Sequence, residues 1–441
     1  MNKFFKGTLI LALAAFVGEC IEFLVNMILA QKLGERGLGL YMTLLPTIFL
    51  IVLLASFELP VAISKFIAEQ DKKYHQSMLK YVIKWTVLFT SVLTLLAIFI
   101  LPFVSIFEGY HPYLRWVVIL FIPITSFSSI IRGFFMGRQQ MGKIAIYNFL
   151  RRLLQLLLLV FLYQFFQFDM ETSVLIAICT LIGSEMIIFL YLLYMFIIQY
   201  QLVKKEQSER MSGNLIRNNL LAVSIPTTTM RVFHASAHAV EPFLIKAALL
   251  NAGVSGVIAT EQFGMLAGIA LTIGFFPAFI AHSFLIMLIP NVSKSFADND
   301  SEQLRNLLQQ VFFITILYGF PAVAIFYLFA ESLTSTFFHS IDAAIYLQML
   351  WPFFLLHYFI IPMQAYLIGL GLMKEALYHF VWSTMISFAV IYVLGSMPLF
   401  QMDGIIIGMN VEAVVLFLLH YLTICKKINV SIFLAPVNRF N

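Results

Sequence analysis

The stretch GTLILALAAFVGECIEFLVNMILA, residues 7–30, decides the fold of this chain. It is almost entirely apolar and longer than the about 20 residues that a helix needs to cross a hydrocarbon core of about 30 Å. It is too long for the apolar part of a signal peptide and lacks a small-residue cleavage site, so we expect it to remain as the first membrane helix. Similar segments recur to the end of the chain. Because lipid offers the backbone no hydrogen-bond partner, they predict membrane-spanning helices.

The composition excludes a water-soluble fold. The 441 residues are 61% hydrophobic and only 11% charged, whereas a soluble domain carries about 25% charged residues. We therefore predict an all-α polytopic membrane protein with about twelve transmembrane helices. The predicted spans are residues 7–30, 40–63, 81–104, 115–135, 146–166, 173–198, 219–249, 262–289, 307–330, 346–370, 376–397 and 404–425.

The basic residues between these spans predict the orientation. Most of them fall on one side, and the connections on the other side hold only Lys32, Arg36 and Arg115. By the positive-inside rule, both termini then lie in the cytoplasm and the protein sits in the cell membrane. The net charge of +5 therefore reflects the orientation in the membrane rather than binding to nucleic acid, and we expect no nucleic-acid partner.

The chain divides into two similar halves. Residues 201–218 form the longest connection, a polar and basic cytoplasmic linker between a lobe at 1–200 and a lobe at 219–425, with a cytoplasmic tail at 426–441. LPVAISKFIAEQD (59–71) aligns with LIPNVSKSFADND (288–300), and Gly34 aligns with Gly253. Six helices per lobe give both copies the same orientation, a parallel pseudo-repeat that in transporters has its site between the halves.

Nothing in the sequence indicates an enzyme. No connection is large enough to be a soluble catalytic domain, and no Gly-rich phosphate loop with Lys-Ser/Thr is present. Cys20, Cys179 and Cys425 are scattered through apolar spans without metal-ligand spacing. We therefore predict no catalytic residues, no metal and no cofactor.

The span at 219–249 carries ionisable residues that lipid should exclude. Arg231, His234, His238 and Glu241 recur at steps of three, four and three residues and so share one face of a helix, with Lys246 to the side. A charge at the bilayer centre costs several kcal/mol, so such a face must meet water, partners or substrate. The two histidines could also be a metal pair, but no thiol or carboxylate set completes a tetrahedral site.

The first span repeats this pattern with Glu19, Glu22 and Asn26, again at helical spacing. One interpretation is that both stripes line a hydrated cavity between the lobes, where they bind substrate or a coupling ion. The other is a set of structural ion pairs, such as Arg231 with Glu19 or Glu22. The first interpretation is favoured, because structural pairs rarely need so many groups on one face.

Glu58 is a further candidate for the cavity because it precedes Leu59-Pro60. The proline disfavours helical geometry in the residues just before it and opens the backbone there. Within a membrane, such irregular backbone is found where protein or a water-filled cavity surrounds it.

One stretch resembles a known family. In LGERGLGLYMTLLPTIFLIVLLASFELPVAISKFIAE (33–69), and in RGFFMGRQQMGKIA (132–145), the sequence is similar to the stage V sporulation protein B type of polysaccharide transporter. This type belongs to the multidrug/oligosaccharidyl-lipid/polysaccharide (MOP) exporter superfamily, which includes the MATE transporters. The resemblance implies two six-helix lobes around a central cavity. It also implies movement of a lipid-linked saccharide, or a related amphiphile, for the cell envelope or sporulation.

Three functions remain open. The first is a flippase for a lipid-linked saccharide that works by alternating access, as a monomer among membrane lipids. The second is a proton- or sodium-coupled multidrug exporter, favoured by an acidic balance in which Glu19, Glu22 and Glu241 face Arg231 and two histidines. The third is a membrane scaffold that recruits envelope enzymes without transport, although a scaffold would not need aligned charges on two equivalent helices.

Overall fold

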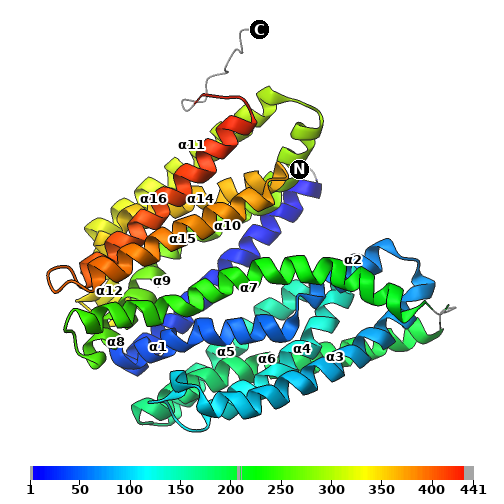
Figure 1. Cartoon of the computed structure of the whole chain (residues 1–441), viewed down its shortest axis with the longest axis horizontal. Coiled ribbons are helices and arrows are strands. Elements are labelled where there is room, and N and C mark those ends of the chain that lie inside the picture. Colours follow the sequence, from blue (N-terminus) through cyan, green and yellow to red (C-terminus); the bar gives the residue numbers. More distant parts are fainter. Residues whose placement is uncertain (1–2, 206–208, 210, 432–441) are drawn as a thin grey trace. The chain divides into compact units, whose positions relative to one another are not determined.

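The computed structural model describes residues 3–205, 209 and 211–431, and of residues 3–15, 205, 226, 285 and 286 only the backbone path. The described chain is built from helices (Figure 1). Eleven segments are long and apolar enough to cross a membrane, which makes this a multi-pass membrane protein, as the sequence predicts. The first of these segments, Phe16–Glu69, covers two of the predicted spans.

The chain packs as two compact units. Unit 1 is formed by Met1–Gly39 and Glu241–Asn441, and unit 2 by Leu40–Val240. These limits differ from the expected lobe boundaries because they fall inside two long helices, α1 (Lys3–Ser56) and α7 (Gly213–Asn251). The linker predicted at 201–218 is accordingly helical at both ends, where α6 runs to Lys205 and α7 begins at Gly213. The last ten residues of the predicted tail lie outside the described residues.

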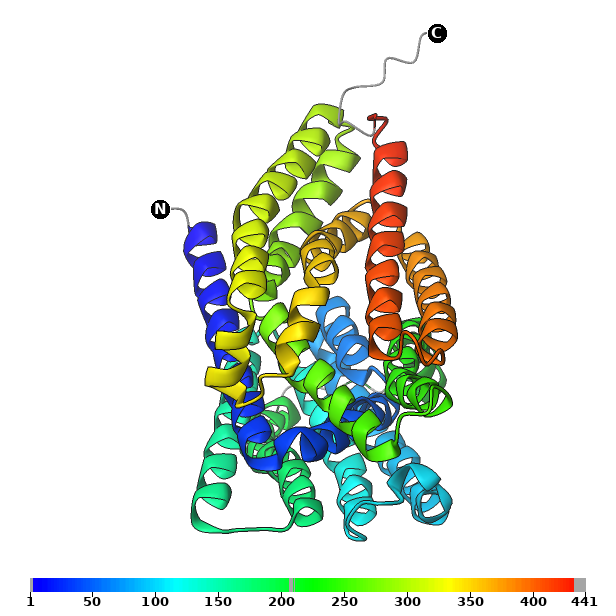
Figure 2. The same cartoon turned by 90° about the vertical axis from the view of Figure 1, so that its left-hand side faces the viewer.

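Unit 2 is a helical bundle with an apolar core. Ile63, Met78, Phe134 and Leu192, from four different helices, are fully buried in it. The α5–α6 hairpin contributes to this core (Figure 2). Besides parts of α1 and α7, the unit contains α2 (Leu59–Glu69), α3 (Lys72–Ile100), η1 (Leu101–Phe103), η2 (Ser105–Phe107), α4 (Leu114–Gly137), α5 (Met141–Phe165) and α6 (Met170–Lys205).

Outside the membrane spans, Glu209 ties the connection after α6 to the start of α3. Lys73 Nζ donates to Glu209 Oε1 at 3.1 Å, and the Glu209 backbone N–H donates to the Lys73 carbonyl at 3.0 Å. The hydrogen bond from Lys73 lowers the pKa of the Glu209 carboxyl. Glu209 is therefore attached to α3 by both backbone and side chain.

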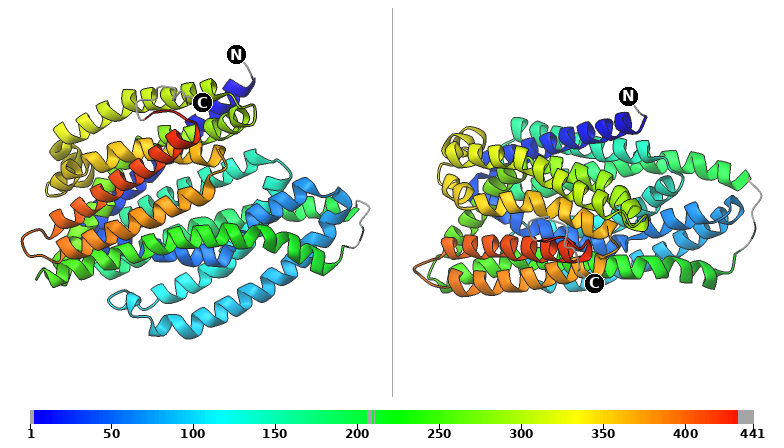
Figure 3. Two further views of the ribbon diagram at one scale, coloured as in Figure 1. Left: turned by 45° about the horizontal axis from the view of Figure 1, so that its top comes forward. Right: turned by 90° about the horizontal axis from the view of Figure 1, so that it is seen from above.

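Unit 1 contains the remaining helices, among which α15 and α16 lie side by side along their lengths (Figure 3). The span predicted at 262–289 is wrong as a single helix. It is broken at Phe276–Pro277, because a proline has no N–H to donate to the preceding turn. The elements are α8 (Gly256–Gly264), a π-helical turn η3 (Met265–Ala270), α9 (Leu271–Phe275), α10 (Ala278–Ala297), α11 (Ser301–Leu328), α12 (Ala330–Phe338), α13 (Ala343–Met349), α14 (Trp351–Gly369), α15 (Met373–Gly395) and α16 (Met402–Lys427).

Within unit 1, α1 and α8 approach each other at glycines. A Cβ atom on Gly39 would lie 1.9 Å from the Thr260 carbonyl oxygen, and one on Gly264 would lie 2.2 Å from the Glu35 carbonyl oxygen. Only glycine, which has no side chain, allows backbones to approach this closely. This is why small residues are enriched where membrane helices pack closely together. Just before this crossing, Gly34 bends α1 with a φ of 63°.

The predicted pseudo-repeat is confirmed by equivalent local geometry. Gly34 and Gly253, which the sequence alignment pairs, both have positive φ, of 63° and 86°. The aligned segments also pack alike. A Cβ on Gly133 of α4 would lie 2.9 Å from Ile63 of α2, and a Cβ on Gly369 of α14 would lie 2.8 Å from Val292 of α10, the residue that the alignment pairs with Ile63.

Candidate functional site

The polar residues of the predicted stripe lie on one continuous helix. Arg231, His234, His238 and Glu241 all belong to α7, so their spacing places them on one face. Arg231 and His238 are exposed, and His234 and Glu241 are half-buried. Because of these polar residues, α7 is not one of the eleven apolar segments, although its 39 residues are more than long enough to cross a membrane.

The second stripe lies in the first half of α1. Glu22 is exposed and Glu19 half-buried. Asn26 Nδ2 donates to Thr272 Oγ1 at 3.3 Å, and that hydroxyl in turn donates to the Gly268 carbonyl at 2.8 Å. Asn26 thus joins α1 to the α9 region within unit 1.

The two stripes are divided between the two units. Glu19, Glu22, Asn26 and Glu241 belong to unit 1, whereas Arg231, His234 and His238 belong to unit 2 together with Glu58. A common water-filled space for all of them stays a prediction.

Glu58 sits at a break in the chain. Phe57 and Glu58 connect α1 to α2 with φ values of 46° and 47°, and Pro60 follows within the first turn of α2. Left-handed backbone is rare for residues other than glycine and costs about 1–3 kcal/mol where it occurs. The proline was predicted to open the backbone just upstream, and this local prediction is confirmed.

The break holds the Glu58 carboxylate against Arg231. Glu58 Oε1 lies 2.8 Å from Arg231 Nη1, close enough for a charge-assisted hydrogen bond. The two partners differ in environment, since the Glu58 side chain is 7% exposed and that of Arg231 65%. An unpaired charge at the buried position would be costly, so Arg231 neutralises Glu58 while most of its own side chain stays exposed.

A second buried polar cluster could not be recognised from isolated residues. Glu185 of α6 accepts hydrogen bonds from Ser128 at 3.3 Å and from Tyr147, and Arg151 Nε lies 3.6 Å from its other oxygen. Arg151 is itself half-buried beside Glu185. Tyr147 and Arg151 are four residues apart, and this helical spacing is the signal that would have indicated the cluster.

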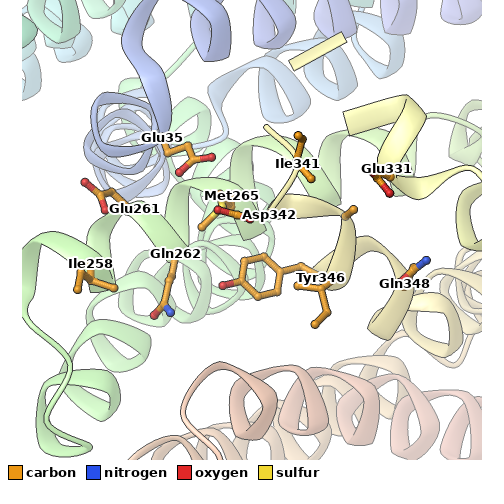
Figure 4. A pocket seen from close by; sticks show the side chains of 12 residues that line it. Glu35, Ile258, Glu261, Gln262, Met265, Glu331, Ile341, Asp342, Tyr346 and Gln348 are labelled. Carbon is orange, nitrogen blue, oxygen red and sulfur yellow. The ribbon is translucent and has the colours of Figure 1, made fainter. Parts of the chain in front are cut away.

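Unit 1 contains an acidic cavity of about 640 Å³ (Figure 4). Glu35, Glu261, Glu331 and Asp342 line it, and none of the described lining residues is Lys or Arg. Ser340 Oγ donates to Glu35 Oε1 at 2.6 Å, which fixes one of the four carboxylates. Among the described residues, no three His, Cys, Asp or Glu side chains are close enough to hold a metal ion. The lining of the cavity is thus acidic.

Comparisons with known proteins place the chain in a family. Residues 4–257 match the family described as Polysaccharide biosynthesis protein. Sporulation protein YkvU of Bacillus subtilis (strain 168) is 51% identical over 100% of this chain and 99% of its own length. Stage V sporulation protein B of the same organism is 30% identical over 98% of this chain and 85% of its own length.

The fold also matches a solved structure, described as the inward-facing conformation of a multidrug resistance MATE family transporter of the MOP superfamily. The TM-score is 0.70 at 19% identity, over 93% of this chain and 95% of that one. The likeness extends along almost the whole chain and confirms the fold class predicted from the sequence. The protein belongs to the polysaccharide biosynthesis protein family and has the fold of the MOP superfamily.

Proposed function

We propose that this protein is a transporter that moves a lipid-linked saccharide, or a related cell-envelope precursor, across the cytoplasmic membrane by alternating access. Its membership of the polysaccharide biosynthesis family supports the class of cargo. The two similar proteins with sporulation in their names support a role in the envelope of the spore. The MOP fold supports transport rather than catalysis.

The observation that carries the proposal is the ion pair between Glu58 and Arg231. A lipid-linked saccharide is joined to its lipid through phosphate, and a guanidinium binds phosphate with two parallel hydrogen bonds. Arg231 is exposed enough to receive such a group. The phosphate would then compete with Glu58 for Arg231. A displaced Glu58 needs another partner at its buried position, which a proton or a sodium ion can supply.

The direct test is transport in proteoliposomes that contain the purified protein and a fluorescent lipid-linked saccharide. Movement from one leaflet to the other is followed by the loss of fluorescence that an external, membrane-impermeant quencher causes. We expect movement to depend on the protein, and an absence of movement with every phosphate-linked saccharide lipid would refute the proposal.

The acidic cavity of unit 1 favours a second candidate, a cation-coupled exporter of organic cations. The described lining holds four carboxylates and no Lys or Arg, a combination that attracts positive charge. The same vesicles separate the two functions when they are loaded with a fluorescent organic cation in place of the lipid. Export of that cation, reduced in a Glu35→Gln variant, would favour the exporter.

His238→Gln is expected to flatten the pH dependence of transport between about pH 5.5 and 7.5, because histidine is the side chain that ordinarily changes charge in this range. Its exposure on α7 gives protons access to it. Initial rates are measured across that range for the wild type and the variant. If both profiles coincide, His238 has no part in proton coupling.

The proposed orientation has both termini and the 201–218 linker in the cytoplasm. In a protein with its three native cysteines replaced by serine, Ser212→Cys should react with an impermeant thiol reagent only in inside-out vesicles. Glu108→Cys should react only in right-side-out vesicles, and both residues are exposed. The reverse pattern would overturn the orientation.

A further inference from the structure

A second cavity, of about 240 Å³, lies within unit 2 between α3 and α7, and we call it the α3–α7 cavity. Its walls are mainly apolar and aromatic, and include Phe57, Leu59, Trp85 and Phe89. Arg217 is the one charged residue among the described residues that line it. The chemistry of the lining is thus that of a site for an amphiphile with an apolar body and an anionic end.

One polar atom in the cavity lacks a partner. Ser224 lines the cavity and is 1% exposed, yet its Oγ has no hydrogen-bond partner in the described part of the chain. Buried hydroxyls are hydrogen-bonded in the large majority of cases, so an orphaned one points to a group that binds there. Ser224 and Arg217 are seven residues apart on α7, about 10 Å along the helix axis. The ligand therefore needs polar atoms near both residues.

The size and opening of the cavity narrow the choice of ligand. Sites that enclose a whole small molecule measure about 300–1,000 Å³, so this cavity is too small for a saccharide head with its lipid. Trp85 and Phe89 are 46% and 37% exposed, and their neighbours Leu88 and Val92 on α3 are exposed as well. The apolar wall thus continues onto an exposed apolar surface of α3, from which a hydrocarbon chain can enter sideways.

We infer that the α3–α7 cavity binds the lipid anchor of the cargo, a single hydrocarbon chain that ends in phosphate; this rests on the proposed function. Arg217 pairs with the phosphate, an ester oxygen meets the Ser224 hydroxyl, and the chain packs against the aromatic wall. An ordinary membrane phospholipid fits less well, because it brings two chains to a cavity with room for part of one.

The position of the cavity connects the anchor to the ion pair. Phe57 and Leu59, which line the cavity, are the residues on either side of Glu58. A chain in the cavity therefore contacts the left-handed turn that aims Glu58 at Arg231. Phe57, Glu58 and Leu59 thus position both the lipid anchor and the Glu58–Arg231 ion pair.

The experiment is a binding titration with Trp85 as reporter. Trp116, Trp351 and Trp382 are replaced by Phe, and the purified protein is titrated with geranylgeranyl monophosphate in detergent micelles. The matched ligands are geranylgeraniol, which has the same chain without phosphate, and dioleoyl phosphatidylglycerol, which has two chains. We expect a saturable change in Trp85 fluorescence that is strongest with the monophosphate.

Two variants assign the contacts. Ser224→Phe fills the cavity and should abolish the response to both single-chain ligands, with Ile225→Phe on the exposed side of α7 as its control. Arg217→Gln should weaken binding of the monophosphate at least about tenfold, the effect of losing one charge-assisted hydrogen bond, and leave geranylgeraniol unchanged. Arg36→Gln, at an exposed arginine in unit 1, should bind as the wild type does.

The outcomes separate this inference from the proposed function. If Trp85 does not respond, if the two-chain lipid binds equally well, or if Arg217→Gln affects both single-chain ligands alike, the inference is wrong, whatever the transport assay gives. If Ser224→Phe does not fold, Arg217→Gln alone decides. Binding as expected in a protein that moves no lipid-linked saccharide would instead refute the proposed function and leave a lipid site.

Discussion

Glu58→Gln is expected to reduce transport about tenfold or more while the protein remains folded. The substitution keeps the shape of the side chain but removes the charge that holds Arg231 at 2.8 Å. A hydrogen bond to a charged group contributes about 1.5–3 kcal/mol, and each 1.36 kcal/mol is a factor of ten in a rate or an equilibrium. The measurement is the initial rate of lipid-linked saccharide movement in proteoliposomes, at equal amounts of reconstituted protein.

Two comparisons show whether the effect belongs to this ion pair. Glu69→Gln removes the same charge from α2, where Glu69 pairs at 3.8 Å with Lys65 and both side chains are more than half exposed. Surface pairs of this kind contribute little, so this control should transport as the wild type does. The double variant of Glu58→Gln with Arg231→Gln should lose much less than the product of the single losses. Additive losses, or normal transport by Glu58→Gln, would show that the pair has no role.

Gly39→Ala is expected to destabilise the protein. Overpacking a core typically lowers the free energy of unfolding by about 1–3 kcal/mol, and we expect a loss of at least this size. The added methyl group would lie 1.9 Å from the Thr260 carbonyl oxygen, so α1 and α8 must separate. Backbone atoms cannot turn aside as the end of a long side chain can. Gly264 of α8 lies against the Glu35 backbone of α1 at the same crossing. Moving the two helices apart therefore breaks the contacts of both glycines. The expected result is a lower midpoint of thermal unfolding in detergent.

The matched control is Gly183→Ala in α6. No heavy atom lies within 4 Å of the position that its Cβ would take, apart from its own helix and neighbours. Alanine is better than glycine inside a helix by up to about 1 kcal/mol, so this variant should unfold at the wild-type temperature or slightly above it. Equal midpoints for the two variants would mean that α1 and α8 do not need backbone contact.

The sequence predicts the membrane class, the repeat and the position of the Glu58 break, because each follows from local chemistry. Apolar length specifies a span, and Pro60 disturbs the residues just before it. Helical spacing also places Arg231 and Glu241 on one face. Spacing cannot say which neighbour that face meets, since this depends on how the helices rotate and pack. The pairing of Arg231 with Glu58 within unit 2 therefore had to come from the structure.

Sequence spacing likewise cannot show where the chain divides into two units, or which residues of different helices line one cavity. The polar linker suggested a division near residue 201, but α1 and α7 extend through the actual limits of the units. Arg217 and Ser224 belong to none of the patterns found in the sequence. Only the cavity between α3 and α7 gives them a shared environment.

The composition of unit 1 has a consequence for biosynthesis. Its first 39 residues leave the ribosome early, but the contacts that hold them come from the far end of the chain. Asn26 is separated from Thr272 by 246 positions, and Phe23 packs against Phe337 later still. At about 5–20 residues per second, the ribosome needs roughly 10–50 s to supply the first of these partners. During that time the opening helix resides in the bilayer with its polar face still without these contacts, a period in which an insertion factor or chaperone has the opportunity to act on it.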